Sequence, residues 1–349
     1  MSIYQVGIIG CGKPWRSEGA TGFGMSHAHA QGYNASPDCK IVALADISEE
    51  NARAFQTKHG GDRIYTDYHT MLAQEQLDIV SISTWPHLHA PMVIDCAAAG
   101  VKAIHCEKPM APTFGEAKRM VEACERNGVQ LTFNHQRRFN QPFRKARELV
   151  RAGAIGTLQR IEATCDNLMD WGTHWFDMCC FLNDETPVEW VIGQIEGRGS
   201  KQIFGLLCEG QGISHFQFQN GVTGLLITGT SAQPRLGIQL SGTSGVLEIG
   251  ASEETPLRLL GAGQGWSTVA VDEGMHGLDK VGLGVLDLVD ALKTGREPEL
   301  AARRALRATE LIFATYESSR RRGRIDLPLT IEDSPFLSMV EAGEMVTDA

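Results

Sequence analysis

The sequence lacks the features of a membrane-spanning or nucleic-acid-binding protein. No stretch reaches the roughly 18 uninterrupted apolar residues that a transmembrane helix requires. No clustered basic face is visible, and the net charge of -10 opposes binding to a phosphate backbone. The first apolar strand begins near Ile3, which leaves no room for a signal peptide, so we expect a cytoplasmic protein.

The cysteine pattern does not fit a disulfide framework. Nine cysteines are present without any C-x-x-C pair, and several lie inside apolar runs, which is typical of reduced, buried thiols. Two His-x-His pairs, His27/His29 and His87/His89, are the only metal-like spacing. On a helix a spacing of two turns the side chains to nearly opposite faces, so we expect no metal ion.

The length of 349 residues indicates two domains, because a domain commonly holds about 150 residues. Over residues 1–135, short apolar runs alternate with helical patterns, which is typical of a doubly wound α/β (Rossmann) domain with a parallel sheet. We expect strands at 5–9, 40–45, 78–83, 101–106 and 129–133, and helices at 49–59, 87–99 and 114–127.

Residues 136–349 have a different texture and predict an α+β domain. Residues 157–271 are rich in glycine and β-formers, and Asn220-Gly221 predicts a hairpin turn, so we expect a large, mostly antiparallel sheet. The acidic residues after 331 are expected to form a surface tail. Helices are expected at 141–152, 278–293 and 301–322.

The first strand ends in the glycines of a dinucleotide-binding turn. Gly10-Cys11-Gly12 permits a tight turn and close approach of the backbone to a pyrophosphate at a helix N-terminus. The third glycine, Gly24, comes late, because residues 13–23 fill a gap of two residues in the usual fingerprint. An ordinary glycine-rich turn is the alternative interpretation.

Asp46 closes the second predicted strand. A carboxylate at this position accepts hydrogen bonds from both hydroxyls of an adenosine ribose and repels a 2′-phosphate. The next residue, Ile47, offers no cation to a 2′-phosphate. The pattern therefore predicts NAD rather than NADP, unless Asp46 serves only as the N-cap of the helix that starts near Ser48.

Two further segments carry groups suited to proton transfer. Lys108 follows the apolar run 101–106 and precedes a proline, so it should present an ammonium at the rim of the sheet, where open α/β sheets bind ligands. Asp170 and His174 are four residues apart and would share one helix face, where a carboxylate can orient an imidazole as a general base. An N-cap aspartate beside a first-turn histidine is the structural alternative.

Together these motifs resemble the Gfo/Idh/MocA oxidoreductase family. The resemblance rests on Gly10-Cys11-Gly12, Ala45-Asp46, Glu107-Lys108-Pro109, Glu317-Ser318-Ser319 and residues 134–139, 153–156 and 170–177. It implies a Rossmann domain that binds NAD(P) and a second domain whose open-faced sheet pairs with another subunit. It also implies hydride transfer at a secondary alcohol of a sugar, sugar derivative or cyclitol.

The resemblance also assigns roles to single residues. It implies catalysis by Lys108, Asp170 and His174. It implies substrate contacts from Lys108, Arg138, Asn167, Asp170 and His174. It implies cofactor contacts from Gly10, Gly12, Gly24, Asp46, Ile47, Thr84, Trp85, His89, Glu107 and Lys108. Residues 165–169 lack the glycine pair that the family often has there, so no particular sugar is assigned.

The preferred function is that of an NAD-dependent sugar or cyclitol dehydrogenase that forms a homo-oligomer, a dimer or tetramer. His174 would take the hydroxyl proton while Lys108 stabilises the oxygen. One alternative is a redox-elimination enzyme, in which tightly held NAD transiently oxidises a sugar and a glycosidic bond is cleaved without net redox change. The other is a dinucleotide- or sugar-sensing protein without catalysis.

Overall fold

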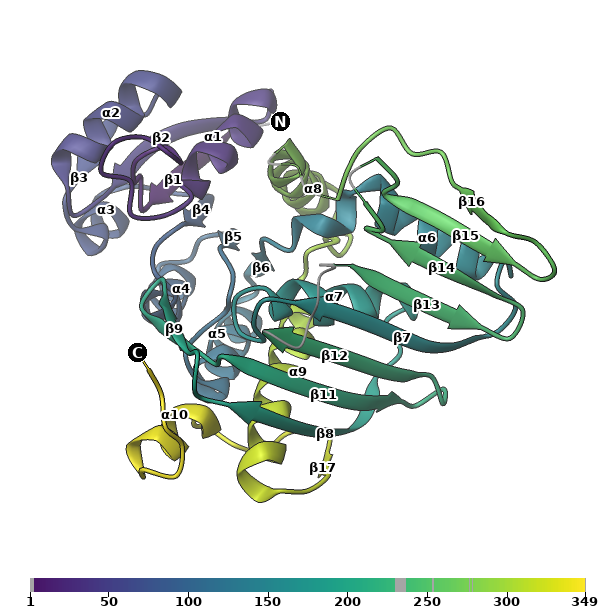
Figure 1. The fold of residues 1–349 in the computed structure, drawn as a ribbon. Helices are drawn as coiled ribbons and strands as arrows, with labels where there is room; N and C mark the ends of the chain where they lie inside the picture. The colour runs from purple at the N-terminus through teal and green to yellow at the C-terminus, as the bar shows by residue number, and fades with distance from the viewer. Residues whose placement is uncertain (1–2, 230–236, 253, 276, 278, 349) are drawn as a thin grey trace. The chain divides into compact units, whose positions relative to one another are not determined.

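The chain forms two compact units in the computed structural model, which describes residues 3–229, 237–252, 254–275, 277 and 279–348 (Figure 1). The first unit comprises Met1–Pro112, Glu116–Gln136 and Leu278–Leu306, and the second comprises Thr113–Gly115, Arg137–Gly277 and Arg307–Ala349.

One segment lies in a different unit from the one that the sequence indicated. We expected the helix near 278–293 in the second domain, but α8 (Asp279–Thr294) packs in the first unit against α1 (Met25–Ala35). The two helices meet at glycines, since a Cβ on Gly32 would lie 3.0 Å from the Cα of Gly282. A contact between residues so far apart in the chain leaves no local signal in the sequence.

The first unit is built on a six-stranded sheet in the order β3-β2-β1-β4-β5-β6, with every neighbouring pair parallel. This confirms the predicted doubly wound domain. The strands are β1 (Tyr4–Ile9), β2 (Cys39–Ala45), β3 (Arg63–Tyr65), β4 (Ile79–Ile82), β5 (Ala103–Cys106) and β6 (Gln130–Phe133). The remaining helices around it are α2 (Glu49–His59), α3 (Tyr68–Gln74), α4 (Pro86–Ala98) and α5 (Phe114–Asn127).

Both faces of the parallel sheet are covered. One core contains Tyr33, Phe55 and Val285 from α1, α2 and α8, and the other contains Met71 and Met120 from α3 and α5. Burial on both faces explains why these strands are nearly continuous apolar runs. The strand order reverses between β1 and β4, so the carboxyl ends of these strands form the crevice where open α/β sheets bind ligands.

The second unit is built on a nine-stranded sheet in the order β16-β15-β14-β13-β7-β12-β11-β8-β17, which confirms the predicted α+β domain. Its neighbours are antiparallel except for β7 and β12. The predicted turn at Asn220-Gly221 joins β11 to β12. The strands are β7 (Leu158–Cys165), β8 (Val188–Glu196), β11 (Gln211–Phe218), β12 (Thr223–Gly229), β13 (Ile238–Gly242), β14 (Gly245–Ile249), β15 (Leu257–Gly261), β16 (Trp266–Thr268) and β17 (Ile325–Asp326).

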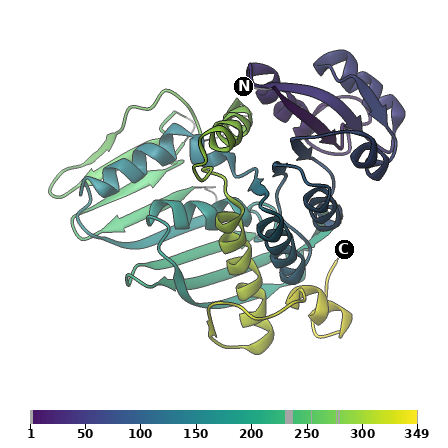
Figure 2. The same ribbon diagram turned by 180° about the vertical axis from the view of Figure 1, so that it is seen from behind.

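Helices cover only one face of this large sheet (Figures 1 and 2). They are α6 (Gln141–Arg151), α7 (Gly172–Leu182) and α9 (Ala302–Arg321), and a short hairpin of β9 (Lys201–Ile203) and β10 (Leu206–Cys208) lies beside the sheet. The prediction of an acidic surface tail is wrong, because residues Pro335–Glu341 form α10. The ring of Phe336 in this helix packs 5.6 Å from the Tyr316 ring. Among the described residues, no helix has the length and apolarity to span a membrane.

Candidate functional site

Three glycines shape the turn after β1, and each does so differently. Gly10 has φ 85 and packs against the end of β4, since a Cβ there would lie 2.8 Å from the oxygen of Ser83. Gly24 closes the long loop before α1, where a Cβ would lie 2.4 Å from the oxygen of Lys13. Gly12 has φ 53 and no heavy atom within 4 Å of a Cβ position, so its backbone borders open space. That space suits close approach of a phosphate to the main chain.

Asp46 lies at the end of β2 and contacts this turn directly. Its Oδ2 accepts a hydrogen bond from the Gly12 N–H at 3.0 Å, and its Oδ1 accepts one from the Ser48 N–H at 2.8 Å. The N-cap of α2 is Ser48, whose hydroxyl accepts from the Asn51 N–H, so the capping alternative for Asp46 is wrong. Ile47 is 96% exposed and places no cation beside the carboxylate.

The long loop of residues 13–23 is folded on itself. Turn hydrogen bonds link Ser17 N to the Pro14 oxygen at 3.1 Å and Ala20 N to the Ser17 oxygen at 3.1 Å. The rings of Trp15 and Phe23 lie 5.6 Å apart, and both are nearly half exposed. The loop therefore presents an aromatic pair next to the glycine turn of the first unit.

The segments after β4 and β5 are joined by a buried histidine. His89 of α4 is fully buried, with Nδ1 3.0 Å from the Pro109 oxygen and Nε2 3.2 Å from the Thr84 oxygen. Thr84 packs on Gly10 and its hydroxyl lies 3.4 Å from the Met92 sulfur. His89 therefore holds these two segments together, and its expected contact with a cofactor stays a prediction.

Trp85 is the exposed residue of this edge. Its side chain is 43% exposed, directly before α4, and its ring lies 6.2 Å from that of His87. An exposed indole at the carboxyl end of β4 remains available to a ligand.

Lys108 follows β5 and is half-buried, whereas the preceding Glu107 points into the protein. The Glu107 carboxylate accepts from His29 Nε2 at 2.9 Å and Asn134 Nδ2 at 2.7 Å, and its Oε2 accepts from the Lys108 N–H at 3.2 Å. Burial acts to raise the pKa of Glu107, but His29, Lys108 and Asn134 hold it below its usual value. The Glu107 side chain therefore supports the main chain at Lys108, and its expected contact with a cofactor stays a prediction.

The two His-x-His pairs make contacts within the first unit. His27 Nδ1 lies 2.8 Å from His59 Nε2, and His29 Nδ1 lies 2.6 Å from the Ser81 hydroxyl. In the part of the chain that the structure describes, no three His, Cys, Asp or Glu side chains gather as metal ligands would.

In the second unit, the turn between β7 and α7 carries Asp170 and His174. Asn167 organises it, because its Oδ1 accepts from the N–H groups of Asp170 at 2.7 Å and Trp171 at 3.3 Å. Helix α7 begins at Gly172, so Asp170 precedes the helix and His174 lies in its first turn. Both side chains are buried. Asn167 thus shapes the turn that presents the other two, and its expected contact with substrate stays a prediction.

Neighbouring arginines differ in what they contact. Arg138 is buried and bonds Asp177 at 2.7 Å and Glu185 at 2.5 Å, so its guanidinium joins α7 to the loop after it. The expected contact of Arg138 with substrate stays a prediction. Arg137 lies 4.6 Å from the ring centre of Trp175, and burial lowers the pKa of Arg137 to about 10 against the attraction of Cys165 and Asp170. Sequence reasoning missed Arg137, although it lies in the recognised segment 134–139.

The sequence and the fold of the chain are similar to those of known proteins. Residues 4–135 match the GFO_IDH_MocA family, described as an oxidoreductase family with an NAD-binding Rossmann fold. The D-apiose dehydrogenase of Paraburkholderia graminis is 26% identical, over 97% of this chain and 94% of the relative. The myo-inositol 2-dehydrogenase of Thermotoga maritima is also 26% identical, but over 53% and 56% of the two chains.

Solved structures show the same fold. A levoglucosan dehydrogenase in complex with NADH and L-sorbose superposes with a TM-score of 0.80 at 20% identity, covering 95% of this chain and 100% of that one. The WlbA dehydrogenase of Bordetella pertussis, in complex with NADH and UDP-GlcNAcA, has a TM-score of 0.75 at 22% identity, covering 94% and 100%.

Proposed function

Because the chain belongs, through residues 4–135, to the Gfo/Idh/MocA family of NAD-binding oxidoreductases, we propose that it is a dehydrogenase for a secondary alcohol of a sugar, sugar derivative or cyclitol. The observation that carries the proposal is the pairing of Asp46 with the open glycine turn at Gly12. The D-apiose dehydrogenase that aligns along nearly the whole chain supports a carbohydrate substrate.

The residues of the first unit fit NAD. The Gly12 backbone leaves room for the pyrophosphate, and each Asp46 oxygen accepts one N–H and keeps lone pairs for ribose hydroxyls. A 2′-phosphate would meet the carboxylate with only the exposed Ile47 beside it. When bound, the nicotinamide supplies the hydride acceptor.

The proposed reaction assigns proton transfer and charge stabilisation to this chain's own side chains. His174 takes the proton of the substrate hydroxyl, and the Lys108 ammonium donates a hydrogen bond to the oxygen as negative charge develops. Asp170 orients the imidazole or binds a neighbouring hydroxyl. In the reducing direction the same proton returns from His174 to the oxygen.

A second candidate is favoured by the folded loop 13–23. A loop that covers bound cofactor would slow its release, and a transiently oxidised sugar carbon acidifies the adjacent C–H. Elimination would then cleave a glycosidic bond, and the hydride would return with no net redox change. The aromatic pair Trp15 and Phe23, next to the glycine turn, is what supports this alternative.

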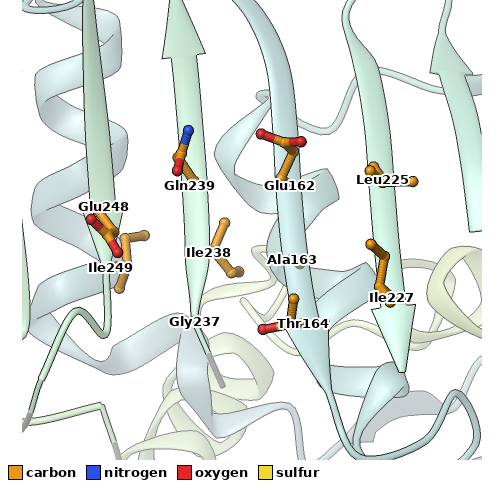
Figure 3. Close-up of a pocket in the computed structure, with 10 residues that line it drawn as sticks. All are labelled: Glu162, Ala163, Thr164, Leu225, Ile227, Gly237, Ile238, Gln239, Glu248 and Ile249. Atoms are coloured by element: carbon orange, nitrogen blue, oxygen red, sulfur yellow. The ribbon is translucent and has the colours of Figure 1, made fainter. Parts of the chain in front are cut away.

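We also propose that the open face of the large sheet joins copies of the chain. On this face Leu225 and Ile227 of β12 lie beside Glu162 of β7, which is in register with Gln239 of β13, so apolar side chains adjoin polar ones (Figure 3). Ile213 of β11 and Ile192 of β8 are 44% and 46% exposed on the same face of neighbouring strands, and exposed apolar side chains that gather on one face mark an interaction surface. Ile213→Glu should lower the mass measured by sedimentation; an unchanged mass contradicts this assembly.

One purification tests the enzymatic proposal. The protein is examined for co-purified NAD and then mixed with NAD and a panel of sugars, cyclitols and glycosides, with absorbance followed at the nicotinamide band. Net NADH formation with a sugar or cyclitol supports the dehydrogenase. Glycoside cleavage without net NADH supports redox elimination. If neither NADH formation nor cleavage occurs with any compound of the panel, the proposal of catalysis is contradicted.

A matched pair of variants ties turnover to the site. His174→Ala removes the proposed base, whereas His87→Ala removes an exposed histidine of the first unit that has no part in the proposed proton transfer. Loss of turnover in the first variant alone supports the assignment.

A further inference from the structure

A buried carboxylate lies behind the turn that carries Asp170 and His174. Glu209 follows β10 and is 3% exposed. Its Oε1 accepts a hydrogen bond from the Leu168 N–H at 2.5 Å, and its Oε2 accepts one from the Tyr316 hydroxyl of α9 at 2.6 Å. The Thr228 hydroxyl of β12 also donates to Oε1, at 3.3 Å.

We infer that Glu209 is a positioning residue that fixes the Asp170–His174 turn through the Leu168 N–H. Asn167 holds the N–H groups of Asp170 and Trp171, at the end of the turn, and Glu209 holds its beginning. Neither acceptor alone restrains the whole turn. The importance of this turn for catalysis rests on the proposed function, but the restraint itself does not.

The partners of the Glu209 carboxylate are neutral. The groups that stabilise its anion are the main-chain N–H groups of Leu168 and of Glu209 itself and the hydroxyls of Tyr316 and Thr228. The titratable groups that face it are the Tyr316 phenol and the Cys165 thiol, and both have pKa values raised by burial and by Glu209 itself. Burial raises the pKa of Glu209 to about 7, against the donors that stabilise its anion. The Glu209 carboxylate that restrains the turn therefore changes its charge near neutral pH.

Protonation should loosen the turn without breaking it. A neutral carboxyl is a weaker acceptor than a carboxylate, and a protonated Oε2 would donate to the Tyr316 oxygen. The Leu168 N–H would keep its partner but hold it less tightly. The order of the turn should thus fall as the pH drops through about 7.

Hydrogen–deuterium exchange of the segment 166–172 tests the restraint without any need for turnover. After correction for the intrinsic pH dependence of exchange, we expect protection of the Leu168 amide in the wild type to drop by about fivefold below neutral pH, as expected for the loss of a charged acceptor. Glu209→Gln should show the lower protection at every pH, because an amide oxygen does not titrate.

Two further variants separate titration from general destabilisation. Tyr316→Phe removes a donor that lowers the pKa of Glu209, so the midpoint of protection should move upward by about one pH unit. Thr315→Val is the matched control, since it removes a buried hydroxyl of α9 that bonds Ser214 and leaves Glu209 untouched. Its midpoint should equal that of the wild type.

The pH profile of kcat is the second readout. Positioning of the catalytic turn is supported if the kcat profile has a limb near neutral pH that disappears in Glu209→Gln and shifts in Tyr316→Phe. The same limb should be unchanged in Thr315→Val. Identical protection of Leu168 in wild type and Glu209→Gln at all pH values would overturn the inference. Protection that behaves as expected in a protein without turnover would instead overturn the proposed function alone.

Discussion

Glu209 should make the protein less stable as the pH rises, unlike most carboxylates. Burial raises the pKa of Glu209 from 4.5 to about 7, so between these values the unfolded chain has lost a proton that the folded chain still holds. This contribution to stability is complete below pH 4.5 and is lost as the pH rises through about 7. Worked from those two values, the loss between pH 5 and pH 8 is about 2 to 3 kcal/mol.

Chemical unfolding of wild type and Glu209→Gln at a series of pH values measures this effect. Subtracting the two curves removes the contributions of all other titrating groups, among them His59, whose pKa burial lowers to about 4. The free energy of unfolding of the variant, relative to that of the wild type, should rise by about 2 to 3 kcal/mol between pH 5 and pH 8. Both proteins are compared at one concentration, because association would otherwise shift apparent stability. A difference that stays flat across this range would refute the reasoning.

Asp46 should favour NAD, so kcat/KM for NAD should exceed kcat/KM for NADP, and Asp46→Ala should lower the ratio of the two. Equal kcat/KM values for the two cofactors in the wild type would contradict ribose binding by Asp46. Shortening the loop 13–23 to two residues should change cofactor retention or substrate affinity, and wild-type constants in a folded variant would refute its role. Lys108→Ala and His174→Ala should each lower kcat at least about a hundredfold with cofactor affinity nearly unchanged, and Lys108→Arg should not restore activity. Asp170→Asn should lower kcat less than His174→Ala does. Steady-state kinetics and NAD titration test all four variants, and a near-normal kcat in His174→Ala would place the base elsewhere.

The sequence predicted most of the fold because its signals are local. Apolar runs separated by helical patterns identified five strands of the parallel sheet, and Asn220-Gly221 located a hairpin in the second unit. The short elements β3 and α3 were missed, since three and seven residues are too few to show a period. The packing of α8 on α1 depends on two glycines that meet only after folding.

The site was predictable where function depends on position at a strand end. Asp46 and Lys108 follow β2 and β5 as expected, and the structure adds the contact of Asp46 with Gly12. The internal contacts of side chains that the resemblance alone assigned to ligands could not be predicted from position in the sequence. Arg138 and Asn167 make their hydrogen bonds inside the protein, and that could be seen only once Asp177 and the turn after β7 were in place.

Glu209 was invisible to sequence reasoning for a physical reason. A glutamate between short β segments usually lies in solvent, and the burial of this one depends on Tyr316, which is 107 residues away. No local pattern records such a pairing, so its raised pKa could not be anticipated.

Each unit has a buried carboxylate behind a residue of the proposed site, Glu107 behind Lys108 and Glu209 behind Asp170. The two carboxylates differ in the charge of the groups around them. Glu107 accepts the Lys108 N–H and faces His29, Asn134 and the lysine itself, which hold the pKa of Glu107 below its usual value. Glu209 accepts the Leu168 N–H and is surrounded by neutral donors, so burial dominates and raises its pKa. The support beneath Lys108 should therefore keep its charge across neutral pH, whereas the support beneath Asp170 should not. A pH dependence of activity that arises from positioning is thus expected from the second unit, and replacing Glu209 rather than Glu107 is the change that should remove it.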